Sequence, residues 1–313
     1  MKKIVILDSA CATQNDLDFE VIKKFGTVEE YPRTPYALAA ERIGDAEIVI
    51  TNKVKIDKEI IDRCPSIKFI SVLATGYNII DIDYAKEKGI IVSNVPSYST
   101  DSVVQHTFAL ILNIACGIDN HINAVKNGKW ATAPDFCLYL KNTFELSGKT
   151  LGIIGYGAIG NKVASVAKAF GMNVLIYSRT PKPETTDKET VFSQSNIISI
   201  HCPLNANSRN LINDETIKIM KEGVIVINTA RGEIVDEKAV QRGLESGKIA
   251  YYAADVSCKE PPERDNPLFA HENCLITPHI AWATTEARNR LIKITSDNIK
   301  AYIGGNPINV VNK

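Results

Sequence analysis

The chain lacks the features that would assign it to several broad classes of protein. It has no excess of either charge, because 36 Lys and Arg residues balance 36 Asp and Glu residues. No overall field therefore draws it to nucleic acid or to an anionic membrane. Its most apolar stretch, residues 108–118, is about half the length of a spanning helix and contains Asn113. The sequence predicts no nucleic-acid partner and no membrane span.

Metal-binding and secretory signals are also missing. The seven cysteines form no C-x-x-C pair, and the five histidines show no H-x(3–5)-H spacing. Asp8 ends the first apolar run before it reaches the length that a signal peptide needs. Unpaired, scattered cysteines are typical of a reducing compartment. We therefore expect a cytoplasmic protein without a metal site.

What is present is the composition of a globular α/β protein. The 313 residues, 45% of them hydrophobic, are enough for two domains. Short β-branched runs alternate with charged, helix-like stretches, which predicts parallel sheets covered by helices on both faces. Predicted strands of a first series are Ile4–Leu7, Glu47–Thr51, Lys68–Leu73 and Ile90–Ser93.

A second and stronger strand series follows a long helix-like run at residues 102–126. That run is apolar on more than one face and needs a second partner surface. The closing stretch, 284–301, is again helix-like, and we expect it to pack on the first unit. Predicted strands of the second series are Leu151–Ile154, Asn173–Tyr177, Ile197–Ile200, Val224–Ile227, Ala250–Val256 and Cys274–Thr277.

A glycine motif lies between the first strand of the second series and a predicted helix. Gly155, Gly157 and Gly160 match G-x-G-x-x-G. In that context the first glycine permits a tight turn, the second lets backbone amides approach a pyrophosphate, and the third lets helix and strand pack closely. The alternative is a glycine-rich turn without a ligand. The flanking strands favour dinucleotide binding.

Three ionisable residues follow predicted strands of the same series, namely Arg231, Glu260 and His279. Ligands of open α/β sheets bind beyond the carboxyl ends of the strands. Singly, each has another explanation: an ion pair for Arg231, an exposed turn for Glu260, and a hydrogen bond to a loop for His279. Together they supply a cation for a carboxylate, a proton carrier and an acid that orients it, as reduction of a 2-keto acid requires.

At these residues the sequence resembles a known family. The glycine motif, residues 228–236, Asp255-Val256 with Glu260-Pro261, and residues 277–281 resemble the NAD(P)-dependent D-isomer-specific 2-hydroxyacid dehydrogenases. Residues 73–78, Tyr98-Ser99-Thr100 with Ser102-Val103, and residues 279–284 look most like the glycerate dehydrogenase branch, which reduces hydroxypyruvate or glyoxylate.

The resemblance implies two doubly wound parallel-sheet domains. A flavodoxin-like substrate domain would comprise residues 1–99 and 284–313, and a Rossmann dinucleotide-binding domain residues 100–283. The same resemblance implies a homodimer that forms through the cofactor domains.

The resemblance also implies roles for single residues. Arg231 would bind the substrate carboxylate and carbonyl, His279 would donate the proton, and Glu260 would hydrogen-bond His279. Backbone amides at Ala74, Thr75 and Gly76 would hold the substrate carboxylate, and Lys53 is a further candidate for substrate contact. Cofactor contacts would come from Gly155, Gly157, Ala158, Ile159, Gly160, Thr107, Cys202, Pro203, Thr229, Ala230, Arg231, Asp255 and His279.

The sequence departs from the family pattern after the second strand of the Rossmann series. In place of the usual acidic residue it has Ser178, Arg179 and Thr180, and Lys182 follows. An acidic side chain there would bind the ribose hydroxyls and repel a 2′-phosphate, whereas an arginine accommodates the phosphate. We therefore expect NADP(H), with NAD(H) as the alternative.

Two other functions remain open from the sequence. One is the same chemistry on phosphohydroxypyruvate, pyruvate or another 2-keto acid. The other is a dinucleotide-sensing scaffold similar to transcriptional corepressors, which would have no need of Arg231, Glu260 and His279.

Overall fold

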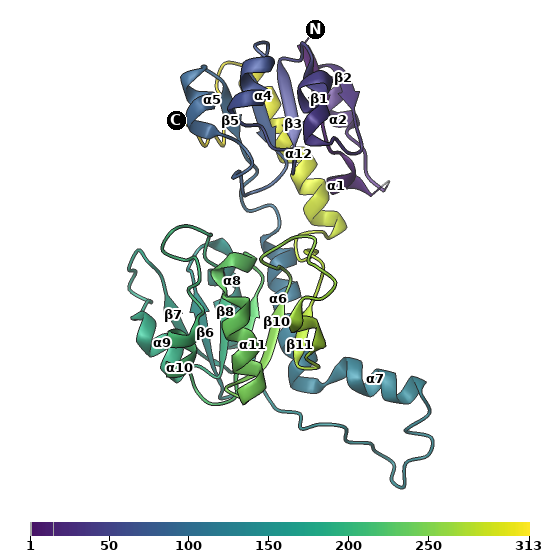
Figure 1. The fold of residues 1–313 in the computed structure, drawn as a ribbon, viewed down its shortest axis with the longest axis vertical. Coiled ribbons are helices and arrows are strands. Elements are labelled where there is room, and N and C mark those ends of the chain that lie inside the picture. Colours follow the sequence, from purple (N-terminus) through teal and green to yellow (C-terminus); the bar gives the residue numbers. More distant parts are fainter. Residues whose placement is uncertain (1, 15) are drawn as a thin grey trace. The chain divides into compact units, whose positions relative to one another are not determined.

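The computed structural model describes residues 2–14 and 16–313. The chain forms two compact units, shown in Figure 1: the first joins Met1–Ser99 to Ala283–Lys313, and the second is Thr100–Trp282. The boundary between the second unit and the C-terminal part of the first lies one residue before the predicted one, at Ala283 instead of residue 284. Each unit contains one parallel sheet, so the prediction of two doubly wound α/β domains is confirmed.

The first sheet has the strand order β2-β1-β3-β4-β5, the flavodoxin-like order. Strands β3 and β4 are buried along their whole length, as expected for parallel strands covered on both faces. Strand β2 was not among the predicted strands. It lies at the sheet edge, so its sequence GTVEE is polar and only partly buried. The strands are β1 Lys2–Ile6, β2 Gly26–Glu30, β3 Ile48–Thr51, β4 Phe69–Val72 and β5 Ile91–Ser93.

The first unit is covered by short helices and one long one. The long helix, α12 (Thr285–Ile303), packs against α2 and β4 through buried residues that include Leu291 and Ile299, as the sequence predicts. Thr284 caps its N-terminus by accepting a hydrogen bond from the Ala287 amide. The other helical segments are α1 Ala10–Thr13, α2 Glu20–Lys23, η1 Tyr36–Leu38, α3 Ala39–Ile43, α4 Lys58–Arg63 and α5 Ile82–Glu87.

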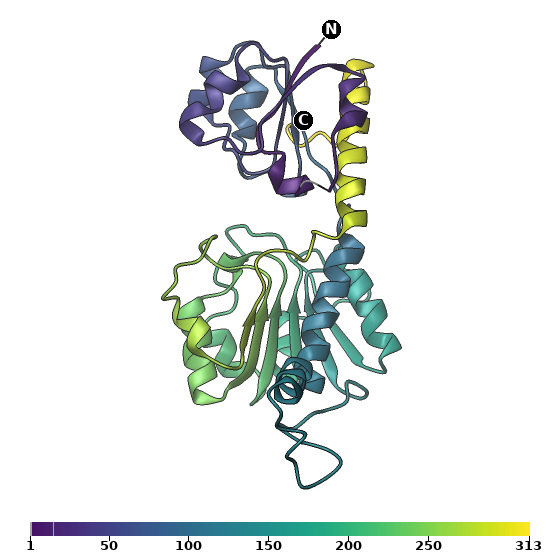
Figure 2. The ribbon, with the colours of Figure 1, turned by 90° about the vertical axis from the view of Figure 1, so that its right-hand side faces the viewer.

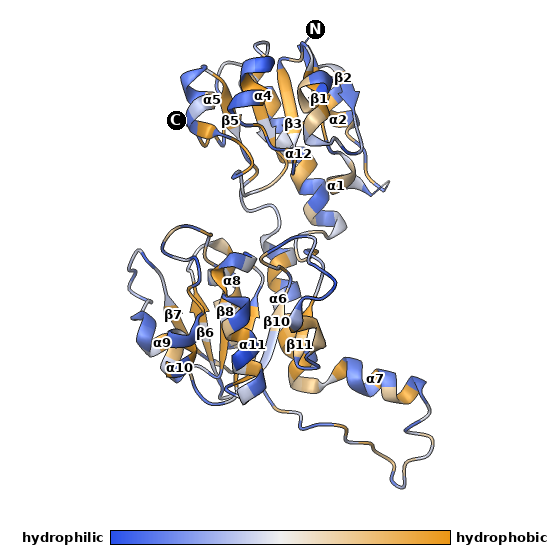
Figure 3. Cartoon of the chain, viewed as in Figure 1, coloured by the Kyte–Doolittle hydropathy of each residue, from blue (hydrophilic) through white to orange (hydrophobic). Residues whose placement is uncertain are grey.

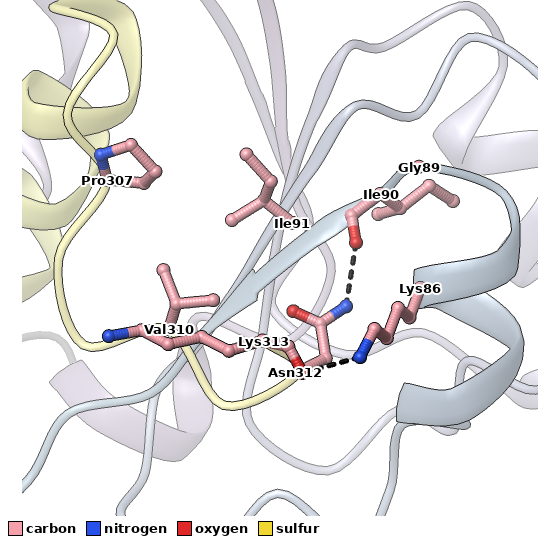
Figure 4. A pocket seen from close by; sticks show the side chains of 8 residues that line it. All are labelled: Lys86, Gly89, Ile90, Ile91, Pro307, Val310, Asn312 and Lys313. Atoms are coloured by element: carbon pink, nitrogen blue, oxygen red, sulfur yellow. Dashed lines mark hydrogen bonds between the residues drawn. The ribbon is translucent and has the colours of Figure 1, made fainter.

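The residues after α12 return to the edge strand β5. The Val311 amide donates to the Val92 carbonyl at 2.9 Å, and the Asn94 amide donates to the Asn309 carbonyl at 3.1 Å. Figure 4 shows a pocket of about 340 Å³ beside this tail, where the Asn312 side chain donates to the Ile90 carbonyl at 2.8 Å. The tail therefore occupies hydrogen-bonding positions that an open sheet edge would expose.

The second sheet has the strand order β11-β10-β9-β8-β6-β7. The order reverses between β6 and β8, so the carboxyl ends of these two strands form the topological switch point at which ligands bind in such sheets. Figure 3 shows most strands of both sheets as hydrophobic and the edge strand β2 as hydrophilic. The strands are β6 Thr150–Ile154, β7 Asn173–Tyr177, β8 Ile197–Ile200, β9 Val224–Asn228, β10 Ile249–Ala254 and β11 Cys274–Ile276.

Helices cover both faces of the second sheet. In Figure 2, α6 (Thr100–Cys116) runs along one face of this sheet, where it contacts α8 and β9. The remaining helical segments are α8 Ala158–Ala169, α9 Lys188–Gln194, α10 Asp214–Ile219, η2 Gly232–Ile234, α11 Glu237–Ser246 and η3 Pro267–Ala270.

The long helix-like run after residue 100 is two helices rather than one. Helix α6 (Thr100–Cys116) ends at Gly117, whose φ of +63° is left-handed, and α7 (Ile118–Lys126) begins there at 62° to it. In the described part of the chain, no single helix is both long enough and apolar enough to cross a membrane. Helices α6 and α7 reach the required length and apolar composition only when they are counted together, and they are bent at Gly117.

Candidate active site

The glycine motif lies at the switch point of the second sheet, between β6 and α8. Gly155 has φ +103°, and a Cβ there would come within 2.7 Å of the Cys202 nitrogen. A Cβ at Gly160 would overlap the Gly155 carbonyl oxygen. Gly157 differs, because a Cβ there would meet nothing within 4 Å. The first and third glycines are thus needed for the turn, and the second borders open space.

That open space lies at the N-terminus of α8. Gly157 is the N-cap residue and has no side chain with which to cap the helix. The first amides of a helix have no partner within the helix and carry partial positive charge. Ala158 and Ile159, the first residues of α8, therefore present donors suited to an anion.

The segment after β7 carries hydroxyl and cationic side chains. Ser178 is partly buried, whereas Arg179 and Thr180 are exposed. The Lys182 ammonium donates to the Tyr156 carbonyl at 3.2 Å and lies 5.0 Å from the centre of the Tyr156 ring. This basic segment therefore reaches back to the glycine turn.

The next strand, β8, brings a second loop to the switch point. The His201 amide donates to the Ile154 carbonyl at 2.7 Å, and this places Cys202 and Pro203 next to the turn at Gly155. Burial raises the pKa of Cys202 to about 11, so its thiol is neutral. The His201 imidazole meets the Ser199 hydroxyl at 2.8 Å through Nε2.

Arg231 follows β9 on a turn shaped by Asn228. The fully buried Asn228 side chain donates to the Arg231 carbonyl at 2.9 Å and accepts from the Ala230 amide at 3.0 Å. The Arg231 guanidinium donates to the Ala230 carbonyl at 2.6 Å through Nη1 and remains partly accessible. The Thr229 hydroxyl lies 3.1 Å from that of Thr107.

Thr107 itself is fully buried on α6. Its hydroxyl also donates to the Val103 carbonyl at 2.8 Å. Its position in the core beside Thr229 fixes α6 against the end of β9.

His279 and Glu260 form a close pair. The His279 Nδ1 atom lies 2.6 Å from Glu260 Oε2, and the two side chains are 27% and 34% exposed. The second carboxylate oxygen of Glu260 accepts from the Ser257 amide at 3.1 Å. Because Nδ1 faces the carboxylate, Nε2 is the imidazole nitrogen left to face a ligand.

Asp255 fixes the backbone that carries His279. Its buried carboxylate accepts from the Ile280 amide at 2.9 Å, the Ala281 amide at 2.7 Å and the Thr277 hydroxyl at 2.6 Å. His279 has φ +56°, a left-handed conformation that is unfavourable for a residue with a side chain. The three hydrogen bonds to Asp255 offset that cost.

The remaining predicted residues lie in the first unit. Ala74, Thr75 and Gly76 follow β4, and the Ala74 and Thr75 carbonyls accept from the Val95 amide and the Asn94 side chain at 2.9 and 2.7 Å. Among the hydrogen bonds of residues 2–14 and 16–313, none is donated by the amides of these three residues. The carbonyls thus fix the loop.

Lys53 is exposed and follows β3. Its amide donates at 2.6 Å to Asp8, a buried carboxylate that also holds the amides of Asn52 and Val54. Burial raises the pKa of Asp8, although these hydrogen bonds oppose the shift.

Several residues around the pair were not predicted. Asn228, Glu237 and His106 all contact predicted site residues or their loops, and His106 Nε2 lies 2.8 Å from the Thr277 hydroxyl. The contacts of His106 and Glu237 join residues far apart in the sequence, so no local motif marks them. Asn228 differs, because it contacts Ala230 and Arg231, two and three residues further along the chain. Within the described residues, no group of three or more His, Cys, Asp or Glu side chains is arranged to hold a metal ion.

Comparison with known proteins identifies similar chains. Residues 108–281 match the model of the D-isomer specific 2-hydroxyacid dehydrogenase NAD binding domain. The chain is 43% identical to the hydroxypyruvate reductase of Blautia hydrogenotrophica, over 99% of this chain and 100% of that one.

Two solved structures share the fold over the whole chain. The D-lactate dehydrogenase of Aquifex aeolicus, complexed with NAD and lactic acid, is 30% identical with a TM-score of 0.87, covering 100% of this chain and 99% of that one. An acyclic imino acid reductase (Bsp5), in complex with NADPH and D-Arg, is 30% identical with a TM-score of 0.88, covering 99% of each chain.

Proposed function

The chain belongs to the D-isomer specific 2-hydroxyacid dehydrogenase family, and we propose that it reduces hydroxypyruvate or glyoxylate to the D-2-hydroxy acid with His279 as the proton donor. Membership makes the protein an oxidoreductase that acts on small 2-keto or 2-hydroxy acids with a nicotinamide dinucleotide. The substrate, the proton donor and the choice between NADPH and NADH are the proposed parts.

The observation that carries the proposal is the 2.6 Å pair of His279 and Glu260. A carboxylate at Nδ1 stabilises the protonated imidazole, and that form has a second proton on Nε2 to donate. In the reduction, Nε2 gives its proton to the carbonyl oxygen of the substrate. His279 is then neutral, Glu260 remains ionised, and solvent restores the proton.

Arg231 would hold the substrate so that its carbonyl faces His279. A guanidinium can donate to a carboxylate and an adjacent carbonyl oxygen together, which fixes the orientation of a 2-keto acid. In the first unit, the amides of Ala74, Thr75 and Gly76 would donate to a substrate carboxylate, since they have no protein acceptor within the described residues. Lys53, exposed after β3, would add a further contact.

The residues around the glycine turn fit a dinucleotide. The space at Gly157 and the amides of Ala158 and Ile159 suit the pyrophosphate. The loop at Cys202 and Pro203 would line the adenosine, and Thr229, Ala230, Asp255 and Thr107 would border the nicotinamide. When bound, the reduced cofactor supplies a hydride to the carbonyl carbon. Gly155 and Gly160 shape the turn that leaves room for it.

We propose NADPH as the preferred form. Ser178, Arg179 and Thr180 offer two hydroxyls and a guanidinium where a carboxylate would oppose a 2′-phosphate. Lys182, bound to the glycine turn at Tyr156, adds positive charge to the same segment.

We further propose that the protein is a homodimer that forms through the cofactor unit. Helix α7 and the loop after it, residues 118–140, carry exposed apolar side chains, among them Phe136 at 90% and Tyr139 at 82%. Figure 3 shows the mixed hydropathy of this segment. Apolar groups in such number favour a protein partner.

A panel of substrates and cofactors tests the proposed function. Oxidation of NADPH and NADH would be followed with hydroxypyruvate, glyoxylate, pyruvate and phosphohydroxypyruvate. We expect the highest kcat/KM with hydroxypyruvate or glyoxylate. The likeness to D-lactate dehydrogenase makes pyruvate the second candidate, and turnover of none of the four would contradict the proposal and favour a scaffold.

Two histidine variants show whether turnover depends on the proposed proton donor. His279→Asn should lose nearly all activity. His271→Asn, a change at a partly buried histidine whose nearest carboxylate is Glu245 at 4.0 Å, should retain it.

A further inference from the structure

The loop that carries Glu260 is fastened to the segment that follows Arg231. Gly232 is buried, and a Cβ there would overlap the backbone of Ser257 and Cys258. The Cys258 thiol lies 3.5 Å from the Val235 carbonyl. Burial and the nearby Glu237 carboxylate raise the pKa of Cys258 to about 12, so the thiol keeps the proton it donates to that carbonyl. The two loops therefore pack backbone to backbone.

One carboxylate binds both ends of the Glu260 loop. Glu237 Oε1 accepts from the Ser257 hydroxyl at 2.9 Å and from the Cys258 amide at 2.8 Å. Glu237 Oε2 accepts from the Asn266 side chain at 3.3 Å. Glu260 lies between these attachment points in the sequence, so Glu237 holds together the two ends of the loop that carries Glu260.

The same contacts lead directly to the proton-donor pair. The Ser257 amide donates to Glu260 Oε1 at 3.1 Å, while Glu260 Oε2 faces His279 at 2.6 Å. Ser257 thus binds Glu237 with its hydroxyl and Glu260 with its amide. A shift of Ser257 would change the direction in which the Glu260 carboxylate points.

Glu237 is not needed to cap its own helix. It is the first residue of α11, and the N-cap is Asp236, whose side chain accepts from the amides of Lys238 and Ala239. The Glu237 carboxylate is directed instead to the 257–266 loop. Its chemistry there is charge-assisted hydrogen bonding, which is stronger and more directional than a neutral contact.

We propose that Glu237 is a positioning residue for the reduction: it holds the 257–266 loop so that Glu260 orients and charges His279. The proposal rests on the proposed role of His279 and Glu260. It predicts an effect on the chemical step rather than on the binding of substrate or cofactor, because Glu237 binds the loop that carries Glu260 and acts through the Ser257 amide on the Glu260 carboxylate.

Kinetics of two Glu237 variants and a matched control test the proposal. Glu237→Ala should lower kcat about tenfold while the KM for the keto acid and the Kd for the cofactor stay within about twofold. Glu237→Gln keeps one carbonyl acceptor and should recover most of the rate. Glu245→Ala, which removes an exposed carboxylate from the same helix, should leave kcat unchanged. A Glu237→Ala enzyme with the kinetics of Glu245→Ala would overturn the proposal.

A double-mutant cycle separates positioning from general destabilisation. If Glu237 acts through Glu260, then Glu237→Ala combined with Glu260→Gln should be no slower than Glu260→Gln alone. Independent, multiplicative losses would contradict it. Should Glu237→Ala fail to fold, Ser257→Ala removes only the hydroxyl contact and takes its place in the cycle, with the same expectation of non-additivity.

Hydrogen exchange of the full-length, cofactor-bound protein tests the positioning without turnover. In Glu237→Ala, the peptide covering residues 256–261 should exchange faster than in the unmodified protein, and in Glu245→Ala it should not. Unchanged exchange would overturn the positioning role. If the unmodified enzyme reduces no keto acid but exchange is faster in Glu237→Ala, the proposed function fails and the positioning role of Glu237 still stands.

Discussion

The His279 imidazole lies 2.6 Å from the Glu260 carboxylate, although the two residues are 19 positions apart in the sequence and His279 adopts a left-handed backbone conformation. The carboxylate at Nδ1 fixes the orientation of the imidazole and leaves Nε2 as the nitrogen that can meet a substrate.

Glu260→Gln keeps the shape of the side chain and removes its charge. The kcat for reduction should therefore fall about tenfold, because the charge-assisted hydrogen bond that orients the His279 imidazole becomes a neutral one. The measurement is kcat for hydroxypyruvate with a saturating reduced cofactor. A rate equal to that of the unmodified enzyme would remove Glu260 from the proton transfer.

Arg231→Lys replaces a planar fork by a single compact charge. Lysine cannot donate to a carboxylate and a carbonyl together, so kcat/KM for keto acids should fall about 100-fold, or about 3 kcal/mol. Cofactor affinity, measured by fluorescence titration, should change little. Arg242→Lys is the matched control, since Arg242 pairs with Asp214 at the surface. Equal loss of cofactor binding would show a structural role for Arg231.

Ser178→Asp tests cofactor choice. The new carboxylate would accept from the ribose hydroxyls and repel a 2′-phosphate, so the ratio of kcat/KM for NADPH to that for NADH should fall about tenfold or more. Arg179→Ala should weaken NADPH alone. The proposed preference fails if the unmodified enzyme already has a ratio clearly below one.

His201, partly accessible but with its Nδ1 atom buried, predicts a loss of stability in acid. Burial lowers its pKa to about 3, whereas in the unfolded chain a histidine titrates near 6.5. Below about pH 6.5 the unfolded state therefore binds a proton that the folded state does not, and the free energy of unfolding falls by up to about 1.4 kcal/mol per pH unit.

His201→Gln removes this contribution. Chemical denaturation between pH 4 and 7.5 should show a flatter pH dependence for the variant than for the unmodified protein. His271→Gln, at a histidine with a partly accessible side chain, is the control. Parallel curves for His201→Gln and the unmodified protein would show that His201 does not cause the acid sensitivity.

Phe136→Ser together with Tyr139→Ser tests the dimer. Removing these two exposed aromatic rings should weaken self-association more than tenfold, because aromatic anchors carry much of the binding energy of an interface. Analytical ultracentrifugation over a concentration series measures it. Phe269→Ser, at an apolar residue 45% exposed outside residues 118–140, should leave the dimer intact. A monomeric unmodified protein would contradict the proposal.

The sequence predicts those parts of the fold that depend on local patterns. Most buried strands appear as continuous β-branched runs. The need for glycine at positions 155 and 160 also follows from the sequence motif, because the turn between strand and helix leaves no room for a side chain there. The polar edge strand β2 gives no such pattern, because only part of it is buried. The break at Gly117 was missed because the apolar residues continue on both sides of the glycine.

The site is less predictable than the fold for a physical reason. Strand ends identify Arg231 and His279, because parallel strands bring their carboxyl ends to one edge of the sheet. The hydrogen bonds of Glu237 and His106 depend on how loops and helices pack after folding, so the sequence shows both as ordinary polar positions. Asp255 was predicted as a cofactor contact, but the sequence does not show that its carboxylate binds the backbone amides beside His279.

The discontinuous first unit has a consequence for synthesis on the ribosome. Helix α12 and the tail on β5 complete that unit, but they are made about 180 residues after its first part. The second unit is continuous in sequence, so it emerges complete while the first still lacks its last helix. Until residues 283–313 are translated, the face of β4 that receives α12 and the edge of β5 are without their covering segments. The nascent chain is therefore most exposed to misassociation during that interval, and a chaperone that binds apolar surface would act on the amino-terminal 99 residues.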